Sequence, residues 1–184
     1  MVKEMLRKME TCKKTIIAIV GPSGSGKTTL SLYLYGRYGI PFVCSYTTRP
    51  MREGETNGVE HIFVTDDDVP DQSEMIAYTV FGGYQYWATK SQIHDVTTYV
   101  IDEKGLIYLK EKFGDEFDIM PVYVTRENID VDRDRQDRDA DRIVFDQSEY
   151  EVVLKNNFET KMEMCERDSE IIFNVLKNRG ISIN

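Results

Sequence analysis

Eight residues near the start of the chain combine glycines, hydroxyl side chains and one lysine in an order that suits phosphate binding. The stretch GPSGSGKT, residues 21–28, fits the pattern G-x-x-x-x-G-K-[ST] at every defined position. Glycine has no Cβ, so the backbone N–H groups of such a loop can turn toward an anion. The lysine can reach the β- and γ-phosphates of a nucleoside triphosphate, and the last hydroxyl can ligate Mg²⁺.

The segments on either side of this loop support the same chemistry. Residues 15–20, TIIAIV, predict a strand buried on both faces of a parallel sheet, and residues 27–39 predict a helix that ends at Gly39. The helix would point its positive dipole end at the phosphates, so a glycine-rich turn that matches by chance is the weaker interpretation. The predicted triphosphate site consists of Gly21, Ser23, Gly24, Ser25, Gly26, Lys27, Thr28 and Thr29, with Thr28 as the metal ligand.

The elements that must position this loop alternate between strands and helices. Further strands are expected over 41–46, 97–102, 118–125 and 169–175, and further helices over 105–114 and about 147–166. Between 47 and about 90, short alternating pieces separated by turn residues predict antiparallel hairpins. The rest indicates an α/β fold with a mostly parallel sheet flanked by helices.

Two arginines after this first α/β unit could hold a second anion. Arg49 and Arg52 stand three residues apart, and guanidinium groups can fork onto a single monophosphate. A transfer between two phosphate groups would need the acceptor phosphate to be held still in this way. The alternative is a pair of solvated surface arginines.

The stretch SYTTRPMREGETNGVEHIFV, residues 45–64, resembles the nucleotide-binding segment of guanylate kinases, with the pattern S-x-T-T-R-x-x-R-x-G-E-x-x-G-x-x-Y-x-F. The resemblance also includes the phosphate loop and a D-x-x-G at 102–105, and so spans most of the chain. It implies a P-loop NTPase-type fold in a single domain over 1–184. The core would lie in 15–46 and 91–184, a nucleoside-monophosphate (NMP)-binding insertion in 47–90, and a short lid at about 133–146.

The same resemblance implies an ATP-dependent kinase that phosphorylates a nucleoside monophosphate, with GMP or dGMP as the default acceptor and Mg²⁺ bound with ATP. The acceptor would be bound by Ser45, Arg49, Arg52, His61, Tyr86 and Asp102. His61 replaces the usual tyrosine of the family, although a histidine can still donate a hydrogen bond. Asp102 ends an apolar strand, so it could also simply cap the following turn.

Two alanines depart from the family pattern where the base is recognised. Ala77 stands where the family has a glutamate that accepts hydrogen bonds from guanine, and Ala88 replaces a serine or threonine. Buried polar groups carry most discrimination between bases, so a kinase for another or a modified (deoxy)nucleotide is a second hypothesis. A third is a non-catalytic binding module, although such guanylate-kinase-like modules have lost the phosphate loop.

A charged segment over 126–142 could form the lid. It contains five arginines, of which Arg138 and Arg142 match the family spacing best, with Arg133 or Arg135 supplying another. Arginines that close over the transferring phosphoryl group would, with Lys27, neutralise its charge and form the catalytic set. The alternative is a solvated, salt-bridged helix face.

Composition limits the partners and the compartment. The net charge of −9 argues against non-specific nucleic acid binding. No apolar run approaches the roughly 20 residues of a membrane span, and the N-terminus lacks a signal-peptide core. Three scattered cysteines, Cys12, Cys44 and Cys165, predict free thiols in a reducing cytoplasm. A monomer or a homodimer is expected.

Overall fold

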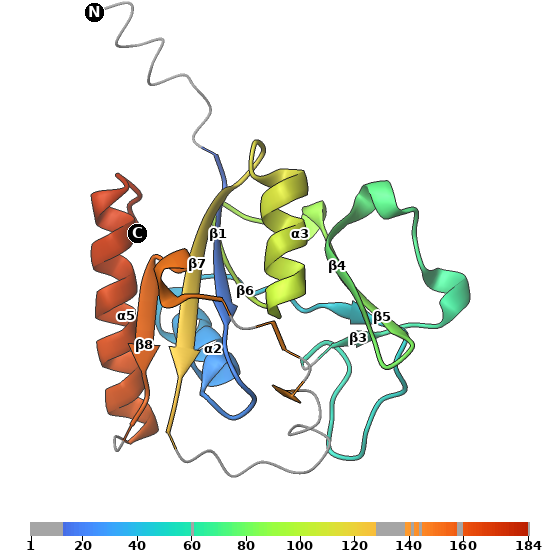
Figure 1. Ribbon diagram of the computed structural model, residues 1–184, viewed down its shortest axis with the longest axis horizontal. Helices are drawn as coiled ribbons and strands as arrows, with labels where there is room; N and C mark the ends of the chain where they lie inside the picture. The colour runs from blue at the N-terminus through green and yellow to red at the C-terminus, as the bar shows by residue number, and fades with distance from the viewer. Residues whose placement is uncertain are drawn as a thin grey trace, which may run out of the picture.

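Four parallel strands form the main sheet, in the order β6-β1-β7-β8 (Figure 1). Their bounds are β1 Thr15–Val20, β6 Val96–Val100, β7 Asp118–Thr125 and β8 Val152–Lys155. The computed structural model describes residues 13–59, 61–127, 139–140, 142–143, 145–157 and 160–183. Strand β1 lies inside this sheet, and all six of its residues are buried because helices pack on both faces, which explains its apolar run.

Helices cover both faces of this sheet, and the alternation of side chains along β1 decides which core each residue joins. The helices are α2 Lys27–Tyr38, α3 Glu103–Phe113 and α5 Lys161–Asn178. Ile17 and Ile19 share a core cluster with residues of α2 and α5, which contact each other. Ile16 and Ala18 belong to clusters that include residues of α3. The predicted fold class is confirmed.

A second, mixed sheet lies beyond α3, which packs between the two sheets (Figure 1). Its order is β3-β2-β5-β4, with β2 and β3 parallel and the other pairs antiparallel. The strands are β2 Tyr46–Thr47, β3 Ile62–Phe63, β4 Met75–Phe81 and β5 Tyr84–Thr89. The short 3-10 turns are η1 Asp66–Asp68, η2 Gln72–Glu74, η3 Lys90–Gln92 and η4 Gln147–Glu149.

The strand expected over 41–46 was largely wrong. Phe42 makes a single parallel bridge to Thr98, with the N–H of Val43 donating to the Thr98 carbonyl. The chain then leaves the main sheet, and β2 begins only at Tyr46, in the second sheet. One apolar stretch therefore serves two sheets, which its hydrophobicity alone does not reveal.

The predictions for the C-terminal third were wrong in two places. The helix expected over about 147–166 begins only at Lys161, because η4 and β8 come before it, and residues 169–175 belong to the same helix, α5, rather than to a strand. A capping box between Thr160 and Glu163 starts α5. Ile172 and Leu176, four residues apart, are buried whereas Ile171 is 37% exposed, so the helical period prevails over the β-propensity of the branched side chains.

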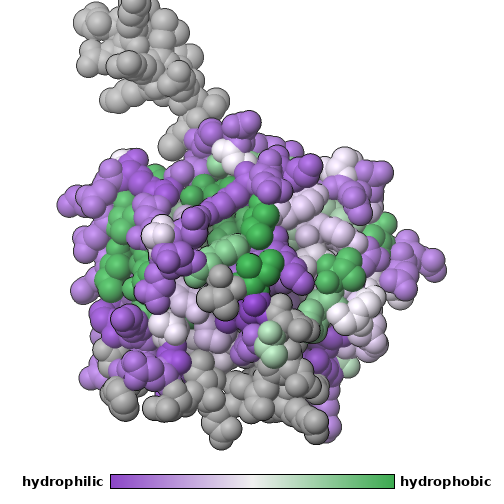
Figure 2. All heavy atoms as spheres, viewed as in Figure 1, coloured by the Kyte–Doolittle hydropathy of each residue, from purple (hydrophilic) through white to green (hydrophobic). Residues whose placement is uncertain are grey.

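The surface is mostly polar. Figure 2 shows hydrophilic residues over much of one face, with hydrophobic residues between them over the parallel sheet. Among the described helices, none has the length and apolar character that a membrane span needs. Neither of the two cysteines that the structure describes, Cys44 and Cys165, is in a disulfide.

Candidate active site

The phosphate loop joins β1 to α2 and depends on its glycines. Gly21, Gly24 and Gly26 have φ angles of 153°, 76° and 103°, which side chains with a Cβ rarely adopt. A Cβ on Gly21 would also lie 2.0 Å from the carbonyl oxygen of Val124 in β7. The loop therefore approaches the sheet too closely for any other residue at this position.

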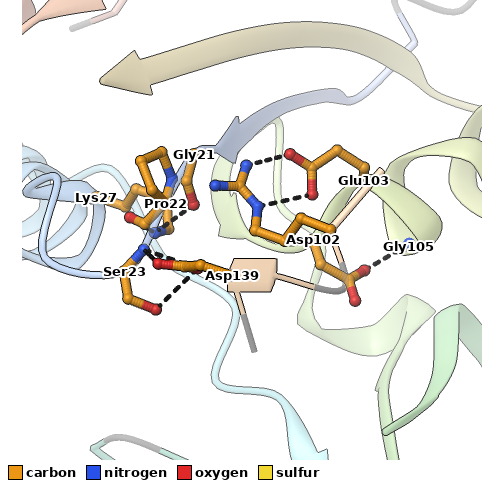
Figure 3. Close-up of polar contacts among 9 residues, drawn as sticks. Gly21, Pro22, Ser23, Lys27, Asp102, Glu103, Gly105 and Asp139 are labelled. Carbon is orange, nitrogen blue, oxygen red and sulfur yellow. Dashed lines mark hydrogen bonds and ion pairs between the residues drawn. The ribbon is translucent and has the colours of Figure 1, made fainter. Parts of the chain in front are cut away.

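Two side chains, Lys27 and Asp139, make hydrogen bonds to the phosphate loop (Figure 3). Lys27 donates through Nζ to the carbonyls of Gly21 and Pro22, at 2.8 and 2.7 Å. The carboxylate of Asp139 accepts hydrogen bonds from the Ser23 N–H, at 3.0 and 3.2 Å, and from its hydroxyl at 3.2 Å. The loop amide and hydroxyl thus already bind one anionic group, which is the interaction a phosphate would make.

A buried amide that sequence reasoning missed holds the base of the loop. Asn156, just after β8, donates through Nδ2 to the Ser25 carbonyl at 2.9 Å, and its Oδ1 accepts from Arg167 on α5. A Cβ on Gly26 would lie 3.1 Å from the Asn156 Nδ2. A polar residue at the carboxyl end of a parallel strand was the available signal, because ligands bind at that edge.

The two threonines predicted for the triphosphate site begin the helix after the loop. Thr28 is exposed in the first turn of α2, with Thr29 beside it. The described residues contain no cluster of three or more acidic, histidine or cysteine side chains that could hold a metal alone. Mg²⁺ commonly uses one or two protein oxygens together with substrate phosphates, so the Thr28 hydroxyl fits an ATP-bound Mg²⁺.

A cleft of about 580 Å³ runs from the phosphate loop to the second sheet. It is lined at one end by Gly21, Ser23 and Lys27, and Asp139 and Arg142 of the lid segment also reach it. Of the predicted acceptor residues, four line the same cleft: Ser45, His61, Tyr86 and Asp102. The structure therefore brings three residues of the predicted triphosphate site and four of the six predicted acceptor residues to one cavity.

The two arginines predicted to bind the acceptor phosphate do not line the cleft, and they differ in burial. Arg49 is buried and makes a two-pronged pair with Glu55, at 2.8 and 3.0 Å, while its guanidinium lies 5.3 Å from the Phe63 ring centroid. Burial alone would lower the pKa of Arg49, but its bonds to Glu55 raise it. Arg52 is exposed, and its backbone N–H donates to Glu55. Arg49 is thus held rigidly, unlike a solvated surface arginine.

The two alanines that depart from the family pattern differ in environment. Ala77 lines the cleft at a β-bulge between Ile76 and Thr79, with φ +51°. Such a left-handed conformation costs a non-glycine residue roughly 1–2 kcal/mol. Ala88 is fully buried and pairs with Ile76 in the ladder. Of the two alanines, only Ala77 therefore lines the cleft.

Asp102 is both a helix cap and a residue of the cleft. It caps α3, accepting from the Gly105 N–H at 2.7 Å, and it also lines the cleft. Burial raises the pKa of its carboxyl group. The next residue, Glu103, is buried and bonds to both Nε and Nη2 of Arg142 (Figure 3).

Of the two predicted lid arginines, the structure describes one. Arg142 lines the cleft; Arg138, like Arg133 and Arg135, lies outside the described residues. Sequence reasoning did not single out Glu103 or Asp139. The signal for Glu103 was a second acidic residue directly after a strand-terminal aspartate, at the sheet edge where ligands bind.

A phosphate loop that opens onto a cleft with a second, strand-built wall defines the class of this protein as an ATP-dependent nucleoside-monophosphate kinase. The family model described as "Guanylate kinase" matches residues 13–104, half of the chain. The chain belongs to the guanylate kinase family, as its sequence predicted.

Individual relatives agree with this assignment. The chain is similar to the guanylate kinase of Helicobacter hepaticus, with 33% identity over 133 residues that cover 67% of this chain and 66% of that relative. It shares 29% identity over 174 residues with the guanylate kinase of Campylobacter jejuni strain RM1221, covering 88% and 82% of the two chains. In fold it is similar to the crystal structure of guanylate kinase from Anaplasma phagocytophilum, with a TM-score of 0.63, 21% identity, and coverage of 88% and 86%.

Proposed function

We propose that this chain transfers the γ-phosphoryl group of ATP to GMP or dGMP. The observation that carries the proposal is the single cleft shared by Lys27 of the phosphate loop and by Ser45, Tyr86 and Asp102 of the acceptor side. The names of the relatives supply GMP as the acceptor. A phosphoryl transfer needs both phosphates held together in one site, and this cleft reaches both sets of residues.

In this proposal the chain acts by holding charge in place. The loop amides and Lys27 bind the β- and γ-phosphates, and Thr28 would hold Mg²⁺, which neutralises charge on the phosphates when it is bound with ATP. Arg142 lies along the same cleft and stabilises negative charge on the group in transfer. The attacking oxygen of a monophosphate is already anionic, so no strong general base is needed.

Arg49, Arg52, His61 and Tyr86 would hold the acceptor phosphate. Tyr86 and His61 line the cleft, and their rings are 5.7 Å apart. Arg49 is linked to this group through Tyr86, whose hydroxyl contributes to the raised pKa of the Arg49 guanidinium. Arg49 would therefore support the phosphate from behind the tyrosine, while its bond to Glu55 keeps it in place.

A second acceptor is favoured by one observation. Ala77 lines the cleft at the position where the guanylate kinases that this sequence resembles have a base-reading carboxylate. A guanine edge bound there would find fewer acceptors, and Ser45 and Asp102 remain. The alternative acceptor is a different or modified (deoxy)nucleoside monophosphate.

The test is a screen of the common ribo- and deoxyribonucleoside monophosphates with ATP, measuring coupled ADP release. Highest kcat/KM for GMP or dGMP supports the first acceptor, and a clear preference for another base supports the second. Absence of ADP release with every monophosphate, from folded protein, would reject the kinase proposal.

Ala77→Glu sharpens the choice of base. If Ala77 occupies the carboxylate position, this variant improves GMP use by about 1–3 kcal/mol in kcat/KM. Glu74→Ala tests the alternative, in which Glu74, exposed at the end of η2, supplies the carboxylate that reads the base. Strong native GMP selectivity that Glu74→Ala abolishes, with no gain from Ala77→Glu, would show that Glu74 reads the base.

A further inference from the structure

Glu103 is buried in a position that needs an explanation. Its side chain is 3% exposed, and it is the first residue of α3, next to the cap residue Asp102. A carboxylate buried this deeply is stable only when it is paired and hydrogen-bonded, and the helix N-terminus gives modest further stabilisation. Its partner in the structure is Arg142, 39 residues later in the chain.

The geometry of the pair orients the arginine. Nε and Nη2 of Arg142 donate to the two carboxylate oxygens, with Nε at 3.1 Å from Oε2. A planar guanidinium bound along this side cannot rotate freely, and its Nη1 remains for another acceptor. Both side chains line the cleft that contains Gly21, Ser23 and Lys27.

Charge supports the same conclusion. Burial alone would lower the pKa of Arg142, but the bonds to Glu103 and its negative charge raise it, so the guanidinium stays charged inside the cleft. Without this carboxylate, the partly buried Arg142 would lose both its orientation and the compensation for its desolvation.

We propose that Glu103 is a positioning residue for phosphoryl transfer: it holds Arg142 in the cleft with one edge directed to the transferring phosphate. This inference rests on the proposed kinase function. Glu103 itself need not touch either substrate. It therefore affects the rate through Arg142, and binding of ATP and of the monophosphate depends on it much less.

The test compares steady-state kinetics of wild type, Glu103→Gln, Arg142→Ala and the double variant, with GMP or whichever monophosphate wild type uses best. Glu103→Gln keeps the shape but places an N–H₂ group against the guanidinium. We expect its kcat to fall about 100-fold, the order that a misplaced group costs, with both KM values within about threefold. In the Arg142→Ala background the same change should cause no further loss, because the two residues act as one unit.

Glu151→Gln is the matched control. Glu151 pairs with Arg179, which also binds Asp118, and none of the three lines the cleft, so kcat should stay at the wild-type value. If circular dichroism shows that Glu103→Gln is unfolded, Glu103→Asp replaces it, because aspartate keeps the charge on a shorter side chain. We expect Glu103→Asp to have a lower kcat than wild type at an unchanged Tm.

Two results would overturn the inference: near-normal kcat in a folded Glu103 variant, or an equal additional loss in the Arg142→Ala background. An inactive wild type would instead reject the proposed function.

Discussion

The two ends of the cleft are built in different ways. The phosphate-loop end comes from one contiguous stretch, residues 21–28, and works mainly through its backbone. The acceptor end collects Ser45, His61, Tyr86 and Asp102 from strands and connections spread over almost 60 residues, and it works through side chains.

This difference explains where the sequence departs from its family. A backbone site needs glycines at a few positions, and the loop retains all of them, with Gly21 packed against Val124 of the sheet. A side-chain site can change its specificity by single substitutions without disturbing the fold. Ala77 and His61, which depart from the family pattern, both line the cleft at the proposed acceptor end.

Lys27→Ala should give the largest effect and should act at the loop end. The lysine lines the cleft and belongs to none of the described core clusters, so its loss should leave the fold intact. Removing the cation from the transferring phosphates should lower kcat by about 10³-fold or more. Single-turnover and steady-state kinetics at equal Tm measure this. A folded variant with normal turnover would contradict the role of the loop end in catalysis.

Arg49→Ala should act at the acceptor end alone. The KM for the monophosphate should rise by about 2 kcal/mol, roughly 30-fold, whereas the KM for ATP should change little. Arg52→Ala should act in the same direction. Arg37→Ala, at an exposed position of α2, is the control and should alter neither constant. Equal effects of Arg49→Ala on both substrates would remove the distinction between the two ends.

Asp102→Asn tests the cost of the buried carboxyl group. Burial raises the pKa of Asp102 in the folded protein. The native state therefore binds a proton on this carboxyl group more tightly than the unfolded chain does, in which the pKa of an aspartate is about 3.9. Wild-type stability should therefore fall as pH rises from about 4 through the raised pKa. Asparagine can still cap α3 at Gly105, so the variant should lack this loss. Urea unfolding at pH 3 and pH 7 measures it; an identical pH dependence in both proteins would contradict the prediction.

The smallest effect should come from replacing the two alanines of the acceptor end by glycine. Ala77→Gly relieves a left-handed conformation, which offsets the lost methyl burial and added chain entropy, so the free energy of unfolding should stay within about 0.5 kcal/mol. Ala88→Gly has no such compensation and should lose about 1.5 kcal/mol. Denaturant unfolding compares them. Equal losses in the two variants would mean that the bulge at Ala77 is not strained.

The sequence alone was enough for the features whose cause is local. The apolar run of β1, the glycine loop and the start of α2 follow from residues that are neighbours in the chain, and so does α3 with its cap at Asp102. The arginine-rich segment after Ser45 identified the family for a similar reason, because its spacing is itself the signature.

Features that depend on distant contacts needed the tertiary structure. Whether residues 169–175 form a helix or a strand depends on which of their apolar side chains the core buries. The pairings of Glu103 with Arg142, of Asp139 with Ser23 and of Asn156 with Ser25 join residues 39 to 131 positions apart. No local period or motif encodes such pairs. The stabilisation that each pair gives arises only when the fold brings two distant segments of the chain together in a site partly shielded from water.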